Sequence, residues 1–172
     1  WFFSFAKQAR QRGDELFIVS HKTEFSNYDS SVHLRRSALD TLGERGFFVP
    51  VDEGGLGFRG QDVFFTSSLG EKIKKTRELK LTHFIDDLPK VIYHSGFPRG
   101  IRKILFEPRL EEVADGTLIF QTWSDIEEFF SLSSWLETAF VSTFSSFRLL
   151  PSSGNNRIYK VEMKNGQSYV AK

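Results

Sequence analysis

Polar side chains stand where two strand-forming runs of the sequence end. Asp86 and Asp87 directly follow the run 82–85, and Ser20 directly follows the run 16–19. Because an open parallel sheet binds ligands beyond the carboxyl ends of its strands, these groups could converge on one site. Two adjacent aspartates at the end of a buried strand repel each other unless a cation neutralises them, which favours a hard-metal site, most simply Mg²⁺.

A helix cap accounts for the same two aspartates. They precede Leu88 and Pro89, and an Asp cap with Pro close behind is a common way to open a helix. Capping and metal ligation therefore stay open as alternatives at this point. Lys72, in the predicted helix before the aspartates, could provide a cation to an anionic substrate or could be an ordinary solvated lysine.

Hydrophobic spacing predicts the elements that would hold these groups. Apolar residues at helical spacing predict helices at 2–12, at 31–43, around 69–79 and, as a short turn, around 91–92. Short runs of strand formers predict strands at 16–19, 63–66, 82–85 and 101–106. The alternation of strand and helix predicts an α/β fold, with residues 1–108 as one Rossmann-like parallel layer.

Three segments resemble motifs II, III and IV of the haloacid dehalogenase (HAD) superfamily, in the expected order. The segments are 18–23, 70–73 and 83–89. The resemblance implies that Ser20 hydrogen-bonds a transferring phosphoryl group, that Lys72 balances its charge, and that Asp86 and Asp87 hold Mg²⁺. It implies a Mg²⁺-dependent phosphohydrolase that acts on a small phosphomonoester through an aspartyl-phosphate. The lack of cysteine separately favours a cytoplasmic location.

The motif that should supply the nucleophile has no counterpart in the sequence. In the HAD superfamily an Asp-x-Asp pair on the central strand precedes the helix that corresponds to 2–12, and no such pair precedes it here. We therefore expect a fragment truncated at both ends that lacks the nucleophile-bearing strand. Alone it should be inactive and poorly stable, while its parent would be the phosphohydrolase.

A second resemblance lies at the other end of the sequence. Residues 149–161 and 169–172 are similar to the opening of an aminoglycoside-phosphotransferase-like kinase lobe, in which the loop of a β-hairpin covers nucleotide phosphates. Asn165-Gly166 is typical of a hairpin turn, although such a hairpin also occurs as an ordinary exposed ribbon. By resemblance, the ATP-binding residues would be Ser153, Gly154, Asn155, Asn156 and Lys172.

These assignments divide the chain into three parts. Residues 1–108 form the incomplete HAD-like domain, 109–147 a helical linker, and 148–172 the start of the kinase-like lobe. Within the linker, Ser124 to Glu127 reads as a capping box that opens a helix. The apolar face of that helix would carry Phe129, Phe130 and Leu136.

Composition excludes several classes of protein. The sequence has 23 Lys and Arg against 22 Asp and Glu, which argues against a nucleic-acid partner. It has no cysteine and no apolar run near the ~20 residues of a membrane helix. We expect a small phosphorylated substrate and no membrane partner, with the oligomeric state open. The competing hypotheses are a non-catalytic HAD-fold module that presents or regulates the kinase-like domain, and a protein whose main activity is ATP-dependent phosphotransfer.

Two further features need an interpretation. Gly55, Gly57 and Gly60 fit a dinucleotide-binding pattern, but they lead into a predicted strand rather than out of one, so a flexible loop is favoured. The glycine-rich segment 47–62 is the candidate for a substrate-selecting insertion. His21, beside the predicted site, could orient a phosphoryl group or hydrogen-bond a neighbouring loop.

Overall fold

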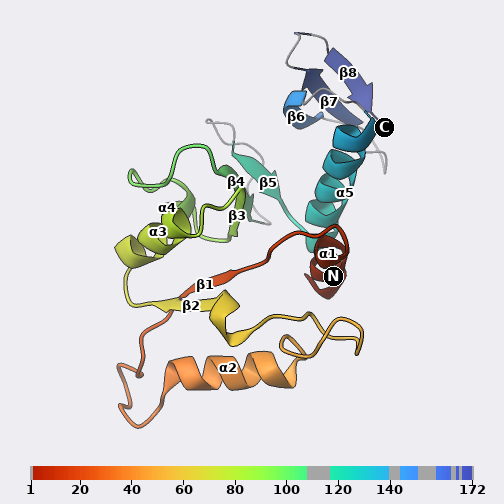
Figure 1. Cartoon of the computed structure of the whole chain (residues 1–172). Coiled ribbons are helices and arrows are strands. Elements are labelled where there is room, and N and C mark those ends of the chain that lie inside the picture. Colours follow the sequence, from red (N-terminus) through yellow and green to blue (C-terminus); the bar gives the residue numbers. More distant parts are fainter. Residues whose placement is uncertain are drawn as a thin grey trace. The chain divides into compact units, whose positions relative to one another are not determined.

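The protein is a mixed α/β chain whose strands are parallel in its first part and antiparallel in its last part (Figure 1). The computed structural model describes residues 2–107, 117–139, 144–150, 158–163, 166 and 168–171. The chain forms two compact units, Trp1–Asp125 and Ile126–Lys172. The α/β class predicted from the sequence is confirmed.

Five strands of the first unit run parallel within two sheets. β1 (Ile18–His21) pairs with β2 (Val63–Thr66), while β3 (His83–Asp86), β4 (Arg102–Phe106) and β5 (Leu118–Phe120) form the second sheet in that order. In the described residues no strand pairing joins β1 to β3. The parallel strands predicted for residues 1–108 are therefore present, but they are divided between two smaller sheets.

The helices of the first unit follow their predicted positions closely. They are α1 (Phe2–Gln11), α2 (Leu34–Glu44), α3 (Leu69–Glu78) and α4 (Pro89–Ile92), with a 3₁₀ turn η1 at Gly60–Asp62. The glycine after α1, Gly13, has a φ of 87° and ends the helix in a conformation that few other residues adopt. At α3 the side chain of Ser68 accepts the amide hydrogen of Glu71, which is an N-cap bond.

Two apolar clusters form the core of the first unit. One joins α3, β3, α4 and β4 through Ile73, Phe84, Val91, Ile92, Phe97 and Leu105. The other joins α1 to the glycine-rich segment through Ala6, Phe47, Leu56 and Phe58. Each cluster combines residues that are distant in sequence, so the burial of apolar surface fixes the helices against the strands and loops.

The glycine-rich segment is a packed loop that leads into a strand. Its backbone folds back on itself, since the amides of Leu56 and Phe58 donate to the carbonyls of Gly46 and Phe47. Gly60 begins η1, and β2 follows directly. The glycines therefore lead into a strand, as predicted, but the segment 47–62 is packed and contributes side chains to the core rather than forming a flexible loop.

The region predicted as a helical linker contains a strand as well as a helix. β5 lies within 109–147 and pairs in parallel with β4, with Ile104 opposite Leu118. The helix α5 (Trp123–Ala139) begins earlier than predicted, because the Thr122 hydroxyl accepts the amide hydrogen of Asp125 at 3.2 Å. Thr122, not Ser124, therefore provides the cap.

The apolar face predicted for α5 is described only in part. Phe129 is buried and Phe130 is partly buried, and their rings pack edge to face at 5.3 Å between centroids. The side chain of Leu136 lies outside the described residues. Among the residues that the structure describes, no helix has the length and apolar character needed to cross a bilayer.

The second unit contains a three-stranded antiparallel sheet. The predicted hairpin is confirmed as β7 (Ile158–Met163) and β8 (Ser168–Ala171), and β6 (Phe144–Leu150) adds a third strand beside β7. Gly166 has a φ of 83° in the connection between β7 and β8, as a hairpin turn requires. The predicted nucleotide loop 153–156 and Lys172 lie outside the described residues.

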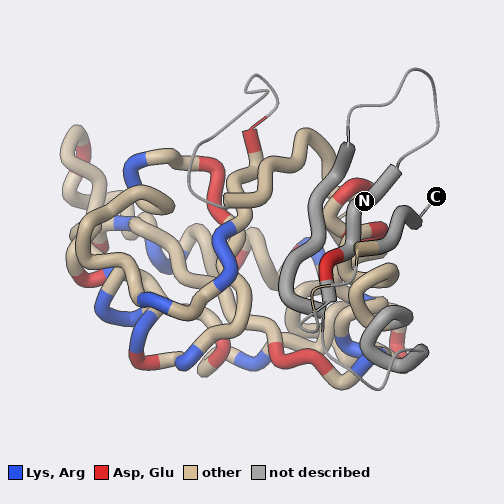
Figure 2. The backbone as a smooth tube through the Cα atoms, turned by 90° about the horizontal axis from the view of Figure 1, so that it is seen from above, with Lys and Arg blue, Asp and Glu red and all other residues tan. Residues whose placement is uncertain are grey.

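Acidic and basic residues are interspersed along the described backbone. Figure 2 shows no long stretch of a single charge sign, in keeping with the overall charge of +1. A site for an anion would therefore depend on local groups rather than on the field of the whole chain.

Candidate functional site

The predicted site residues lie at or near the carboxyl ends of β1 and β3. Ser20 is partly buried within β1, because that strand runs to His21 rather than ending at residue 19. Asp86 is the last residue of β3 and is buried, whereas Asp87 is exposed. Lys72 lies on the buried side of α3.

Lys72 and Asp86 form a buried ion pair. The Lys72 Nζ lies 2.5 Å from the Asp86 Oδ2, and the two side chains are only 8% and 4% exposed. The ammonium also lies 5.8 Å from the centre of the Phe84 ring. Such a pair is expensive to desolvate and persists only when each charge has its partner. The alternative of an ordinary solvated lysine at position 72 is therefore wrong.

Asp86 also organises the start of α4. Its Oδ1 accepts the amide hydrogen of Leu88 at 2.9 Å, and Leu88 is the N-cap residue of the helix, with Pro89 behind it. The carboxylate therefore supports the turn into α4 without occupying the N-cap position itself. This geometry gives Asp86 a structural role, and it leaves the exposed Asp87 as the carboxylate that faces solvent.

The loops after β1 and β2 are joined by a network of hydrogen bonds. The Lys22 amide donates to the Thr66 carbonyl at 2.9 Å, and His21 Nε2 donates to the Ser67 carbonyl at 3.2 Å. Arg35 on α2 donates to both loops, from Nε to the Lys22 carbonyl at 3.0 Å and from Nη2 to Ser67 Oγ at 2.7 Å. His21 thus has the loop-bonding contact that was one of its two predicted roles.

Sequence reasoning did not identify Arg35, Thr66 or Ser67. The signal for Thr66 and Ser67 was present, because Thr66 ends the strand-forming run at 63–66 and Ser67 directly follows it, as Ser20 follows the run at 16–19. Arg35 gave no signal, since an arginine in an amphipathic helix is usually solvated. Its role becomes visible only when α2 is placed beside the ends of β1 and β2.

The donor set offers oxygen ligands of the kind that Mg²⁺ prefers. Asp87 presents an exposed carboxylate, while the oxygens of Asp86 bond Lys72 and the Leu88 amide. Mg²⁺ is commonly held by one or two carboxylates and several waters, and of these two carboxylates only that of Asp87 is open to solvent. Within the described residues there is no group of three or more His, Asp or Glu placed to hold a metal.

A second buried carboxylate, Asp62, belongs to the structural core rather than to this site. Arg59 donates to both of its oxygens, at 3.2 Å and 2.9 Å, and Arg10 lies 4.0 Å away. The hydrogen bond from the Arg59 guanidinium holds the pKa of Asp62 below its usual range. The group therefore fastens η1 and its neighbouring loop to α1.

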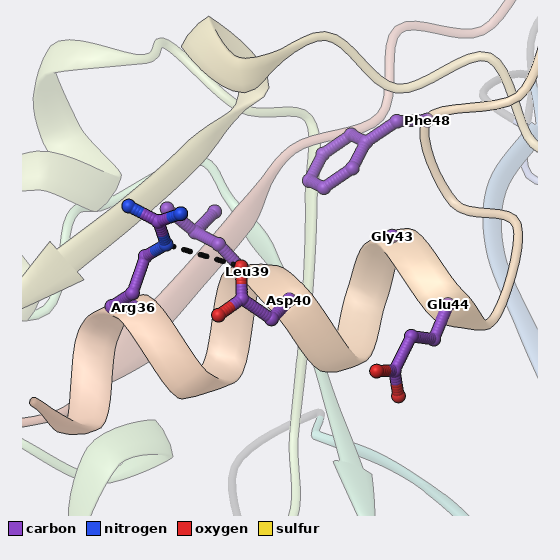
Figure 3. A pocket seen from close by; sticks show the side chains of 6 residues that line it. All are labelled: Arg36, Leu39, Asp40, Gly43, Glu44 and Phe48. Atoms are coloured by element: carbon purple, nitrogen blue, oxygen red, sulfur yellow. Dashed lines mark hydrogen bonds and ion pairs between the residues drawn. The ribbon is translucent and has the colours of Figure 1, made fainter. Parts of the chain in front are cut away.

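An open hollow lies beside α2, away from the predicted site residues. It is lined by Arg36, Leu39, Asp40, Gly43, Glu44 and Phe48 (Figure 3). Arg36 pairs with Asp40 one turn along the same helix, at 3.2 Å. All the charged groups of this hollow are exposed, so it offers no built site for a reaction.

A half-buried histidine, His83 at the start of β3, should make the stability of the protein depend on pH. Burial, and then the nearby Arg102, lower the pKa of His83 to about 4, while Asp14 opposes them. In the unfolded chain this histidine binds its proton near pH 6.5, whereas in the folded protein it stays neutral down to about pH 4. The free energy of unfolding should therefore be highest above pH 6.5 and should fall by up to about 3 kcal/mol as the pH drops to 4. Urea unfolding across this range measures the effect.

Two variants isolate the contribution of His83. A His83→Gln protein should lose most of the change in stability between pH 6.5 and 4. His33→Asn is the matched control, because His33 is exposed and asparagine can replace it as the N-cap of α2. If the His83→Gln protein keeps the pH dependence of the wild type, His83 is not the source of that dependence.

Comparisons of this chain with protein-family models, with curated proteins and with solved structures found no match. The fold and the candidate site by themselves define an α/β protein whose first unit contains parallel strands. Near the carboxyl ends of those strands it carries a serine, a buried Lys–Asp pair and an exposed aspartate.

Proposed function

We propose that this chain contributes to a Mg²⁺-dependent phosphohydrolase of HAD type that acts on a small phosphomonoester. The observation that carries the proposal is the buried pair of Lys72 and Asp86 near the carboxyl end of β3. The helix that bears Lys72 also contacts β1 and β2. One helix therefore connects the strand of Ser20 with the strand of Asp86, as a shared site requires.

Each residue has a role that its chemistry supports. The Ser20 hydroxyl would donate to a phosphoryl oxygen, and Lys72 would offset the negative charge that develops during transfer. Asp87, together with Asp86, would hold Mg²⁺, which when bound neutralises charge on the phosphoryl oxygens. The nucleophile would be an aspartate, and the resemblance places it in an Asp-x-Asp motif that these 172 residues do not contain. The proposal therefore concerns the parent protein.

The complete protein provides the test. With Mg²⁺ it should hydrolyse p-nitrophenyl phosphate, and removing the ion with EDTA should abolish the reaction. Ser20→Ala should lower kcat roughly a hundredfold, since it removes one donor to the phosphoryl group. Asp87→Asn should weaken the response to Mg²⁺, while Glu44→Gln, which changes an exposed acid at the end of α2, should behave as the wild type.

A non-catalytic HAD-fold module is the second candidate, and the hydrogen bond from the Leu88 amide to Asp86 Oδ1 favours it. With this bond in place as well as the Lys72 ion pair, both Asp86 oxygens have partners within the chain, as in a purely structural group. A folded complete protein without Mg²⁺-dependent hydrolysis would support this module. An ATP site at the C-terminal segment stays a prediction, and titration of the complete protein with a fluorescent ATP analogue tests it.

A further inference from the structure

Arg35 joins the two loops that flank the predicted site. Its guanidinium donates from Nε to the Lys22 carbonyl at 3.0 Å and from Nη2 to Ser67 Oγ at 2.7 Å. Lys22 lies two residues after Ser20, and Ser67 precedes Ser68, the N-cap of the helix that carries Lys72. One side chain on α2 therefore connects the chain beside Ser20 to the start of the Lys72 helix.

Ser67 is held at each of its polar groups. Its amide donates to Glu71 Oε2 at 2.8 Å, its carbonyl accepts from His21 Nε2 at 3.2 Å, and its hydroxyl lies within hydrogen-bond distance of Arg35. Glu71 lies in the first turn of α3, directly before Lys72. A displacement of Ser67 would therefore also move the first turn of α3.

The fork geometry of arginine matters here. A guanidinium holds its donors in one rigid plane, so two bonds to two loops fix the direction as well as the distance between them. A lysine ammonium in the same place would keep the charge but would reach only one of the two acceptors well. The contact is thus sensitive to a substitution that preserves charge.

We propose that Arg35 is a positioning residue that sets Ser20 and Lys72 in register with each other. This inference rests on the proposed function, because it assumes that the two residues act on one phosphoryl group. Phosphoryl transfer depends on placement, and a misplacement of about 1 Å can cost a hundredfold in rate. The Arg35 guanidinium hydrogen-bonds protein groups, the Lys22 carbonyl and the Ser67 hydroxyl. It would therefore affect the reaction only through the positions of Ser20 and Lys72.

The experiment compares Arg35 with its neighbour Arg36 in the complete protein. Arg35→Ala and Arg35→Lys are the test variants, and Arg36→Ala and Arg36→Lys are their controls. Arg36 is exposed on the same helix and pairs with Asp40 within that helix, so it joins no loops. Two quantities are measured: amide hydrogen exchange in residues 20–23 and 66–72, and kcat and KM for p-nitrophenyl phosphate with Mg²⁺.

Both Arg35 variants should loosen the two loops together. Exchange should become about tenfold faster in 20–23 and in 66–72, because each loop loses a charge-assisted hydrogen bond. We expect kcat to fall about a hundredfold with KM little changed, and added methylguanidinium to restore part of the rate of Arg35→Ala. The Arg36 variants should match the wild type in all of these measurements.

Other results would overturn the inference. Faster exchange confined to one loop would show that Arg35 does not couple the two, and a wild-type kcat in Arg35→Lys would show that only its charge matters. A complete protein without hydrolysis would overturn the proposed function and with it the positioning role. Even in that case, the exchange pattern alone decides whether Arg35 couples the loops.

Discussion

Replacing Asp86 with alanine should lower the free energy of unfolding by about 3–5 kcal/mol. The change leaves the Lys72 ammonium, whose side chain is 8% exposed, without its counter-charge in the protein interior. It also removes the acceptor of the Leu88 amide at the start of α4. Urea unfolding followed by circular dichroism measures the loss, and Asp87→Ala is the matched control because the neighbouring carboxylate is exposed. Its effect should stay within about 0.5 kcal/mol.

A double variant separates two contributions to the lost stability. One is the cost of leaving the Lys72 charge unpaired in the interior, and the other is the loss of the favourable contact between Lys72 and Asp86. Combining Lys72→Met with Asp86→Leu removes both charges and should recover much of the stability, since buried ion pairs are often replaced by apolar residues at little cost. The energies of the two single changes should therefore not add. If Asp86→Ala and Asp87→Ala destabilise the protein equally, the buried pair does not form in solution.

The same two aspartates separate structure from chemistry. Asp86 is buried in an ion pair that stabilises the fold, whereas the Asp87 carboxylate is exposed, and we propose that it is the one that meets Mg²⁺. Substitution of Asp87 should therefore change the Mg²⁺ dependence of the complete protein without changing its unfolding. The sequence presents them as an equivalent pair, and only their different burial assigns them different tasks.

Elements with their own local signals were predicted well. The residues of β2 match the predicted range 63–66, and α3 begins after the cap Ser68 and buries Ile73 and Thr76 of its predicted stripe. These elements carry both a boundary signal and an apolar period. Where the local signals agree with the tertiary packing, the sequence alone is sufficient.

Elements whose position depends on distant partners were predicted less well. β1 was expected at 16–19 and is found at 18–21, although Leu16 before the strand and Ile18 within it both pack against the core cluster of α1. The apolar character of a residue predicts that it is buried. It does not show whether the residue belongs to a strand or to the segment that leads into one. β5 was missed because three residues are too short to show a period.

The candidate site shows the same division. Ser20, Lys72, Asp86 and Asp87 could be selected by type and by their position after strands or on a helix. That Lys72 pairs with Asp86 could not be predicted, because the two residues are 14 positions apart and lie on different elements. The role of Arg35 could not be predicted for the same reason, since its partners belong to the loops after β1 and β2.

Among the described glycines, Gly55 has the nearest backbone neighbour, and it lies in the loop packed against α1. A Cβ atom at this position would lie 2.1 Å from the Val49 carbonyl oxygen and 2.4 Å from the Val49 Cβ. The nearest neighbour is backbone, so no side-chain rotation can relieve the clash. The same turn holds hydrogen bonds from the Gly55 amide to Pro50 and from the Gly57 amide to Val49.

Gly55→Ala should therefore destabilise the protein by about 3 kcal/mol, at the upper end of what overpacking usually costs. The loop would have to open and draw Leu56 and Phe58 out of their core cluster. Gly60→Ala is the control, because nothing lies within 4 Å of a Cβ there, and it should be neutral or slightly stabilising. Thermal unfolding of the two variants measures the difference. Adding Val49→Gly to Gly55→Ala should restore little of the lost stability, since the closest atom, the Val49 carbonyl oxygen, remains. Full recovery of stability would show that the Val49 side chain, not its carbonyl, causes the clash.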